Sequence, residues 1–432
     1  MTDTIFALSS GPLPAGVALI RISGPQVRDA LLALTGGVPQ PRVANVCALK
    51  AVDGSVIDRG LAVYFAGPAS FTGEDIAELN LHGSRAVVAR MLKELAEMPG
   101  LRFAEQGEFA KRAFLNGKMD LTEAEGLADL IEAETEAQRR FAMVSSTGAQ
   151  RALYSGWRTR LTHARAMLEA ELDFSDQEDV PGSVSDAISA DLEELSVEMS
   201  EHVSGFKRAE ILREGFDVVI IGPPNAGKSS LLNALARREV AIVSDEPGTT
   251  RDLIEVSLDL GGVKVRVTDT AGLRDEAGKV EAIGIERARK RASEADLVLQ
   301  LRDLTQPDEM VAMDGVLVVG SKSDLVDTTD VGGMHISART GEGIASLIDE
   351  IERRACAAAG HSGDILPAQI RHVEYLNWAI VHIEDAISGF DGQTELQAEA
   401  LRMASDQLGR ITGQVDVEDI LDVIFSRFCI GK

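Results

Sequence analysis

The feature that most constrains this chain is an apolar run that ends in a glycine-rich loop and continues into a helix-forming stretch. The run reads FDVVIIG over residues 216–222, and the loop reads GPPNAGKS over residues 222–229. A buried strand followed by glycine, four residues, Gly-Lys-Ser and a helix is the arrangement of a phosphate-binding loop. Its backbone N–H groups turn toward phosphate, and its lysine and serine serve the phosphates and Mg2+. The sequence therefore predicts a nucleotide-binding domain.

Strand-like runs recur after this loop, with helical stretches between them. They read KVRVT, ADLVLQL, GVLVVGS and GMHISA, and the last helix before a change of texture reads IASLIDEIERRACAAA. Alternation of strands and helices is typical of a doubly wound, largely parallel sheet. We therefore expect a multidomain fold that combines α/β and all-α parts, with a Ras-like doubly wound sheet in the P-loop domain.

The segments around this domain differ from it. Residues 1–118 contain short strand-like runs between Gly/Pro turns, which favours a separate α/β domain. Residues 119–212 are poor in proline and show apolar spacing of three and four, and residues 356–432 are helical again. Because the ends of a compact domain often lie close together, we expect residues 213–355 to be inserted in a helical domain. Separate domains in series are the alternative.

Further motifs select guanine. Asp269 ends a strand in DTAG, where it serves Mg2+ through water, and Thr250 in GTTRD completes the Mg2+ shell begun by Ser229. Asp324 in SKSD accepts hydrogen bonds from the guanine N1–H and amine, a donor pair that adenine lacks. The sequence therefore predicts a GTPase. Its candidate GTP-binding residues are Asn225, Ala226, Gly227, Lys228, Ser229, Ser230, Ser244, Thr249, Thr250, Asp269, Thr270, Ala271, Gly272, Ser321, Lys322, Asp324, Ser337, Ala338 and Arg339.

Two substitutions within these motifs affect the expected chemistry. Ser321 stands where the guanine motif usually begins with asparagine, whose main role is to brace the phosphate loop. Leu273 follows DTAG, where Ras-like proteins carry a glutamine that positions water. An apolar side chain cannot orient water, so hydrolysis needs another acid or another cation.

The stretches SFTGEDIAELNLHG, GEFAKRAFLNGKMDLTEAEGLADLI, IVSDEPGTTRD, DTAGLRDEAGKVEAIGIERA and the terminal FCIGK together resemble the MnmE (TrmE) family of tRNA-modification GTPases. The resemblance spans the whole chain. It implies an N-terminal domain that binds tetrahydrofolate and forms a homodimer, a helical domain, and a GTPase domain inserted in it. One departure is Pro223, which stands where the family commonly has a basic residue.

The resemblance also implies a reaction. With the flavoprotein MnmG (GidA), which carries FAD, the family installs an aminomethyl or carboxymethylaminomethyl group at C5 of the wobble uridine of certain tRNAs. The two proteins form a heterotetramer-type complex, and the carbon comes from a tetrahydrofolate derivative (5-formyl or 5,10-methylene). GTP hydrolysis drives the conformational change.

Residue by residue, the resemblance assigns a K+ site and a catalytic acid. Asn225 and the stretch 244–249, with Ser244, Glu246 and Thr249, match the segments that ligate K+. A monovalent cation there neutralises developing charge, as an arginine finger does. Glu281 matches the glutamate that orients water, and it acts with Lys228; a solvated surface acid is the alternative interpretation of Glu281.

The folate site implied by the resemblance draws on both ends of the chain. Arg21, Glu78 and Lys118 match its positions, and Lys432 joins them from the C-terminus. A carboxylate suits the pterin amine and N–H, and cations suit the glutamyl tail. Cys429 lies near this tail; chemistry at its thiol is one interpretation, and a buried small apolar side chain is the other.

Charge and cysteine content limit the partners and the compartment. The formal net charge is −26, so tRNA contact needs a local patch or a partner surface. Arg151, Arg158, Arg160 and Arg165 predict either a cationic helix face or a solvated helix. The three cysteines form no metal or disulfide pattern, and no long apolar run predicts a membrane span or a secretion signal, so we expect a cytoplasmic protein.

Two other functions use the same motifs. A ribosome-assembly GTPase is one, but a basic RNA-binding module would then be expected after the nucleotide domain, and residues 356–432 hold five Lys/Arg against twelve Asp/Glu. The other is a folate enzyme that transfers one carbon without help from GTP.

Overall fold

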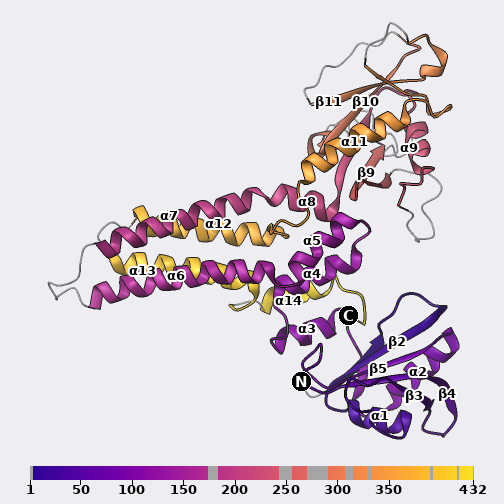
Figure 1. The fold of residues 1–432 in the computed structure, drawn as a ribbon, viewed down its shortest axis with the longest axis vertical. Helices are drawn as coiled ribbons and strands as arrows, with labels where there is room; N and C mark the ends of the chain where they lie inside the picture. Colours follow the sequence, from indigo (N-terminus) through magenta and orange to yellow (C-terminus); the bar gives the residue numbers. More distant parts are fainter. Residues whose placement is uncertain are drawn as a thin grey trace, which may run out of the picture. The chain divides into compact units, whose positions relative to one another are not determined.

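The structure is a computed structural model that describes residues 3–173, 183–242, 255–269, 290–306, 315–328, 333–389, 393–415 and 418–431. The chain forms two compact units. One comprises Met1–Ala128, Arg151–Arg160 and Ser405–Lys432, and the other comprises Asp129–Gln150 and Leu161–Ala404. Each unit contains one six-stranded sheet. The predicted combination of α/β and helical parts is confirmed (Figure 1).

The sheet of the first unit has the order β3-β4-β5-β2-β1-β6. Its strands β1 to β5 pair antiparallel, and β6 pairs parallel with β1. The strands are β1 (Thr4–Leu8), β2 (Ala15–Ser23), β3 (Asn45–Lys50), β4 (Val56–Phe65), β5 (Ile76–Gly83) and β6 (Leu101–Phe103).

Alternation along β1 explains how this sheet is covered. Phe6 joins a core formed with helices α1 (Val27–Thr35) and α2 (Arg85–Glu97). Its neighbours Ile5 and Ala7 lie in a different cluster, with Phe109 of helix α3 (Glu108–Leu115). Because successive side chains of a strand point to opposite faces, β1 is covered on both faces.

The C-terminal segment packs in the same unit. Helix α14 (Glu418–Phe425) contributes Phe425 to an apolar cluster with α3 and with α4 (Leu121–Glu132). The Phe425 ring centroid lies 6.3 Å from that of Phe114. Beyond this helix, Ile430 bridges to Gln106 and the Gly431 carbonyl accepts a hydrogen bond from Ser9 Oγ at 2.7 Å. The end of the chain is thereby fixed to the N-terminal domain.

The sheet of the second unit has the order β12-β11-β10-β7-β9-β8 and is parallel except for β8. The doubly wound sheet predicted from the alternation is confirmed, but its antiparallel edge strand was not foreseen. Its strands and flanking helices are β7 (Phe216–Ile221), α9 (Lys228–Ala236), β8 (Glu255–Leu260), β9 (Val263–Asp269), β10 (Leu297–Asp303), β11 (Val316–Ser321), β12 (Met334–His335) and α11 (Ile344–Ala359).

The described residues also form further helices, several of them long. Helices α7 and α12 pack side by side, and α5 and α8 pack against each other and against strand β9 (Figure 1). Among the described residues, no helix is long and apolar enough to cross a membrane. The helices are α5 (Glu136–Ser146), α6 (Ala149–Asp173), α7 (Ser183–Ser204), α8 (Phe206–Glu214), α12 (Ile370–Glu384) and α13 (Thr394–Thr412), with a π-turn at Asp385–Gly389 and a 3-10 turn at Ser323–Leu325.

Candidate functional site

The glycine-rich loop lies where the order of the strands reverses. Strand β7 has β10 on one side and β9 on the other, and all three are parallel. Ligands of such sheets bind at the carboxyl ends of the strands at this switch point. Gly222, with φ of 152°, follows β7, and a Cβ there would lie 2.6 Å from the Leu301 carbonyl oxygen. The loop therefore requires glycine at its first position.

The lysine of the loop is held by the loop itself. Lys228 is buried, and its Nζ donates to the carbonyl oxygens of Gly222 at 2.9 Å and Pro223 at 3.0 Å. Pro223 thus contacts Lys228 through its backbone carbonyl oxygen, and the replacement of the family's basic side chain by proline leaves that oxygen in place. Asn225 is exposed and has a positive φ of 64°, an uncommon conformation that asparagine tolerates better than most residues.

Two oxygen-bearing side chains meet beside the loop. The exposed Ser229 Oγ donates to the buried Asp269 Oδ2 at 2.7 Å, and Ser230 is exposed next to them. Hydroxyl and carboxylate oxygens are the ligands that Mg2+ prefers. The donor set fits the metal that the sequence predicts.

Ser321 still braces the phosphate loop, although it replaces an asparagine. Its hydroxyl lies 2.7 Å from the Ala226 carbonyl oxygen and 3.1 Å from that of Arg302. The next residue, Lys322, pairs with Asp303 at 2.6 Å. Ser321 therefore contacts the phosphate loop directly, although its side chain is shorter than that of asparagine.

The proposed guanine-reading carboxylate is already hydrogen-bonded. Asp324 Oδ1 accepts from Ser337 Oγ at 2.6 Å, and Oδ2 accepts from Arg339 at 2.7 Å. These bonds, that of Ser337 foremost, lower the pKa of Asp324 and keep it charged. Ala338 lies half-buried between Ser337 and Arg339. The residues predicted to read guanine are thus brought together.

Several predicted residues lie outside the described part of the chain. They are Ser244, Glu246, Thr249, Thr250, Thr270, Ala271, Gly272, Leu273, Glu281 and Lys432.

Three predicted folate residues lie around one loop, residues 70–75, in the N-terminal domain. Arg21 Nη2 and Glu78 Oε1 are 2.8 Å apart across strands β2 and β5. The ring centroid of Phe71, which belongs to the loop, lies 5.4 Å from the Arg21 guanidinium carbon. A Cβ at Gly73 would lie 3.3 Å from the Lys118 side chain, so Lys118 packs on the same loop. The loop therefore links the three residues.

Cys429 is exposed, so the interpretation of this residue as a buried apolar side chain is wrong. It directly precedes Ile430, which bridges to Gln106. The tail is held by its backbone and leaves the thiol accessible to solvent.

The arginines of helix α6 are bonded to neighbouring side chains. Arg151 lies 3.5 Å from Glu123, Arg165 lies 3.0 Å from Glu169, and Arg158 hydrogen-bonds Gln414. Acids that are distant in the sequence supply part of this pairing. The helix therefore does not present these three arginines as an unpaired cationic face.

The sequence analysis missed one buried basic residue. Arg112 of α3 is fully buried and forms ion pairs with Asp3, Glu74 and Glu108. The only indication of a buried arginine in the sequence was a pair of basic residues between apolar ones in the stretch GEFAKRAFL. Most of the partners of Arg112 are distant in the sequence.

Two family models match the chain. Residues 121–429 match the MnmE helical domain, and residues 4–118 match the N-terminus of the GTP-binding protein TrmE. Together these matches cover nearly the whole chain.

Relatives of similar length agree with these models. The chain is 58% identical over 439 residues to the tRNA modification GTPase MnmE of Mesorhizobium japonicum, covering 100% of this chain and 99% of the relative. It is 56% identical to the tRNA modification GTPase MnmE of Chelativorans sp., covering 100% and 98%. The G domain of the FeoB iron transporter of T. maritima is similar over 34% of this chain and 99% of its own, at 23% identity and a TM-score of 0.24. Because this TM-score is low, the assignment of the chain to a family depends on the sequence relatives and not on this structure.

Proposed function

The chain belongs to the MnmE family of tRNA modification GTPases, and from this membership we propose a specific reaction for it. It is a GTP hydrolase that acts in tRNA modification. We propose that, together with MnmG and its FAD, it installs an aminomethyl or carboxymethylaminomethyl group at C5 of the wobble uridine. The carbon comes from a tetrahydrofolate derivative.

The proposal for the nucleotide site rests on the contact between Ser229 and Asp269, which lies beside the loop that holds Lys228. Lys228 would exchange its two carbonyl partners for the β- and γ-phosphates. Ser229 and Asp269, 2.7 Å apart, would hold Mg2+ directly and through water, with Thr250 as a further ligand. Mg2+ supplies positive charge beside the phosphates.

Asp324 would read the guanine base from the other end of the site. Its two oxygens already accept from Ser337 and Arg339, so the carboxylate is oriented and charged. The N1–H and amine of guanine would meet it there, whereas adenine offers no matching donor pair. Lys322 and Ala338 would contact the nucleotide from either side of Asp324.

We propose that K+ replaces the missing water-positioning glutamine. Asn225, Ser244, Glu246 and Thr249 would ligate the ion in a dimer of GTPase domains, and Glu281 would orient the water. The support is Asn225 at the exposed tip of the loop and the sequence of the segment 244–249.

We propose that the N-terminal domain binds the tetrahydrofolate derivative through Arg21, Glu78, Lys118 and Lys432. The first three residues fit this ligand: a guanidinium and a carboxylate lie side by side, and the ammonium stem of Lys118 packs nearby. Bound folate supplies the one-carbon unit. Cys429, exposed on the tail, remains a candidate for chemistry at this site.

The proposed organisation follows from the same membership. We propose a cytoplasmic homodimer in which residues 213–355 form the GTPase domain, inserted between helical segments 119–212 and 356–432, after a folate-binding domain at 1–118. MnmG would join it in a heterotetramer-type complex that holds tRNA.

One experiment tests the proposed reaction. Cells whose own copy is deleted would carry Lys228→Ala, and their wobble uridines would be measured by mass spectrometry. We expect loss of the modified nucleoside, because without the lysine the γ-phosphate is not held. Lys290→Ala is the matched control, since that side chain is 78% exposed and pairs only loosely with Glu294 at 3.9 Å. Normal modification with Lys228→Ala would reject GTP-driven modification and favour a folate enzyme that acts unaided.

A second measurement tests the cation. Hydrolysis by the purified protein should slow strongly when Na+ replaces K+, because the smaller ion fits the ligand set poorly. Equal turnover in both salts would remove K+ from the mechanism and leave the rest of the proposal standing.

A further inference from the structure

We propose that Arg112 is a positioning residue of the folate site: it fixes the loop 70–75, and this loop sets Arg21 and Lys118 in place. The inference rests on the proposed folate-binding function, which it extends to a residue that does not touch the ligand.

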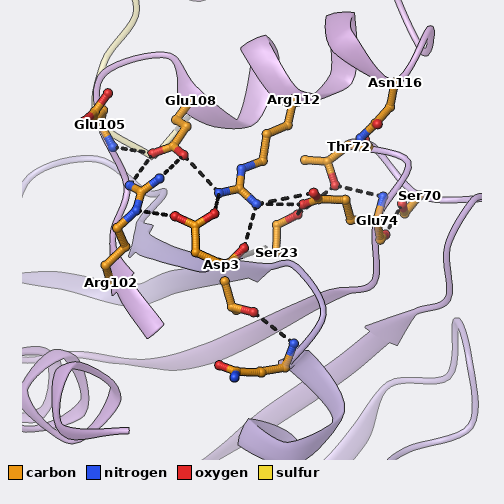
Figure 2. Close-up of polar contacts among 12 residues, drawn as sticks. Asp3, Ser23, Ser70, Thr72, Glu74, Arg102, Glu105, Glu108, Arg112 and Asn116 are labelled. Carbon is orange, nitrogen blue, oxygen red and sulfur yellow. Dashed lines mark hydrogen bonds and ion pairs between the residues drawn. The ribbon is translucent and has the colours of Figure 1, made fainter. Parts of the chain in front are cut away.

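Arg112 is the centre of a buried ionic cluster (Figure 2). Its side chain has 0% exposure. Nη1 donates to the Asp3 carbonyl oxygen and to Glu74 Oε2, both at 3.0 Å. Nη2 donates to Asp3 Oδ1 and Glu108 Oε1, also at 3.0 Å. The guanidinium thus joins three segments that are far apart in the sequence.

Glu74 transmits this anchor to the loop. Its Oε2 also accepts from Ser23 Oγ at 2.9 Å, and Ser23 Oγ lies 2.7 Å from Thr72 Oγ1 (Figure 2). Asn116, which follows α3, donates to the Thr72 carbonyl oxygen at 2.7 Å. Strand β2 and the end of α3 therefore hold the same loop from two sides.

The loop in turn shapes the surroundings of Arg21. The Arg21 guanidinium carbon lies 5.4 Å from the Phe71 ring centroid and 5.7 Å from that of Phe109. Phe71 belongs to the loop, and Phe109 lies three residues before Arg112 on α3. An arginine between two aromatic rings is held by cation–π attraction as well as by its ion pair with Glu78. A shift of α3 relative to the loop would open this arrangement.

Lys118 depends on the same loop from its other end. A Cβ at Gly73 would meet the Lys118 side chain at 3.3 Å and the Asn116 Cβ at 3.0 Å. Gly73 has φ of 79°, which favours glycine. The absence of a side chain at Gly73 lets Lys118 lie across the loop, so a displaced loop displaces Lys118.

The charges explain why arginine is needed at this position. Arg112 and Arg102 face three carboxylates, those of Asp3, Glu74 and Glu108. Burial raises the pKa of Glu108, but its bonds to Arg102 and Arg112 outweigh this and leave the pKa lowered. The planar fork of arginine reaches Glu74 and Glu108 at once, whereas a lysine ammonium is a single point charge. Arg112→Lys would keep the charge and loosen the hold on the loop.

The test measures tetrahydrofolate binding by calorimetry with the full-length protein. We expect Arg112→Lys to weaken binding about tenfold, while GTP hydrolysis stays within twofold of the parent. Glu74→Gln, which keeps the size of the side chain, should act in the same direction. Lys111→Ala is the matched control, because this neighbour on α3 pairs with the exposed Asp422 and should leave the affinity unchanged.

A double-mutant cycle separates positioning from general stability. If Arg112 acts through the loop, Arg112→Lys should weaken binding little further once Phe71→Ala has removed the loop's contact with Arg21. Additive losses, or parent-like affinity of Arg112→Lys, would overturn the inference and leave the folate site intact. A parent protein that binds no tetrahydrofolate would instead overturn the proposed folate function, and the inference with it.

Discussion

Replacing Ser321 by alanine tests the contact that braces the phosphate loop. The Ser321 hydroxyl lies 2.7 Å from the Ala226 carbonyl oxygen, and both residues are buried. Alanine removes the hydrogen bond without adding volume. The net value of such a bond is about 1 kcal/mol. Because the carbonyl belongs to the phosphate loop, we expect this loss to appear in nucleotide binding.

The expected size of the effect follows directly. A loss of about 1 kcal/mol corresponds to about fivefold in Kd, since tenfold is about 1.4 kcal/mol. Titration with a fluorescent GDP or GTP analogue would measure it, and thermal unfolding without nucleotide would show how much of the loss falls on the folded domain itself.

Ser323 provides the matched control. It lies two residues further along the same segment and is buried, and its Oγ has no hydrogen-bond partner within the described part of the chain. Ser323→Ala should therefore leave Kd within twofold of the parent. Equal affinities for parent and Ser321→Ala, or equal losses in the two variants, would refute the idea that Ser321 braces the loop.

Three further outcomes are expected. Gly343→Ala should lower the free energy of unfolding by about 2 kcal/mol or more, because φ is 72° and a Cβ would lie 2.0 Å from the His335 carbonyl oxygen; an unchanged melting temperature would contradict this. Burial, with His372 nearby, lowers the pKa of His202 from 6.5 to about 4. As the pH falls from 6.5 toward 4, the unfolded chain therefore takes up a proton that the folded chain does not bind. The free energy of unfolding falls over this range by up to about 3 kcal/mol. In denaturant titrations at several pH values, His202→Gln should reduce the dependence of the unfolding free energy on pH. An equal pH dependence in the parent and the variant would contradict this role of His202. Ser229→Ala should raise the Mg2+ concentration for half-maximal hydrolysis about tenfold, which a Mg2+ titration at saturating GTP would check.

Motifs predicted which described residues gather at the glycine-rich loop, because spacing specifies the loop and the order of parallel strands brings the other residues to it. The loop between Gly222 and Ser229 is specified by spacing, and the strand before it by the largely apolar run FDVVII. Asp269 and Ser321 end strands β9 and β11, and parallel strands bring their carboxyl ends to one edge. The fold class followed from the same alternation of strands and helices.

Contacts between distant segments were not predictable in this way. Arg112 meets Asp3 and Glu74, and no spacing rule relates these positions; only its pair with Glu108 follows the i,i+4 spacing of a helix. The backbone bridge between Gln106 and Ile430, next to the exposed Cys429, is another such contact that the sequence does not reveal. The antiparallel pairing of β8 with β9 is local instead: Gly261 and Gly262 form the two-residue turn between Leu260 and Val263, a hairpin signal that the prediction did not use.

Lys228 and Asp324 of the nucleotide site are paired with protein atoms, and this lowers the affinity for any nucleotide. Lys228 is bonded to two loop carbonyls, and Asp324 to Ser337 and Arg339. Binding therefore exchanges one set of bonds for another, so that only the difference contributes to affinity. Guanine would displace the contact between Asp324 and Arg339, and it would donate two hydrogen bonds to Asp324 in place of that contact. Adenine would displace the same contact and return no donor pair. Because the cost of breaking the ion pair is the same for both bases, the discrimination against adenine equals the value of the two hydrogen bonds that only guanine returns.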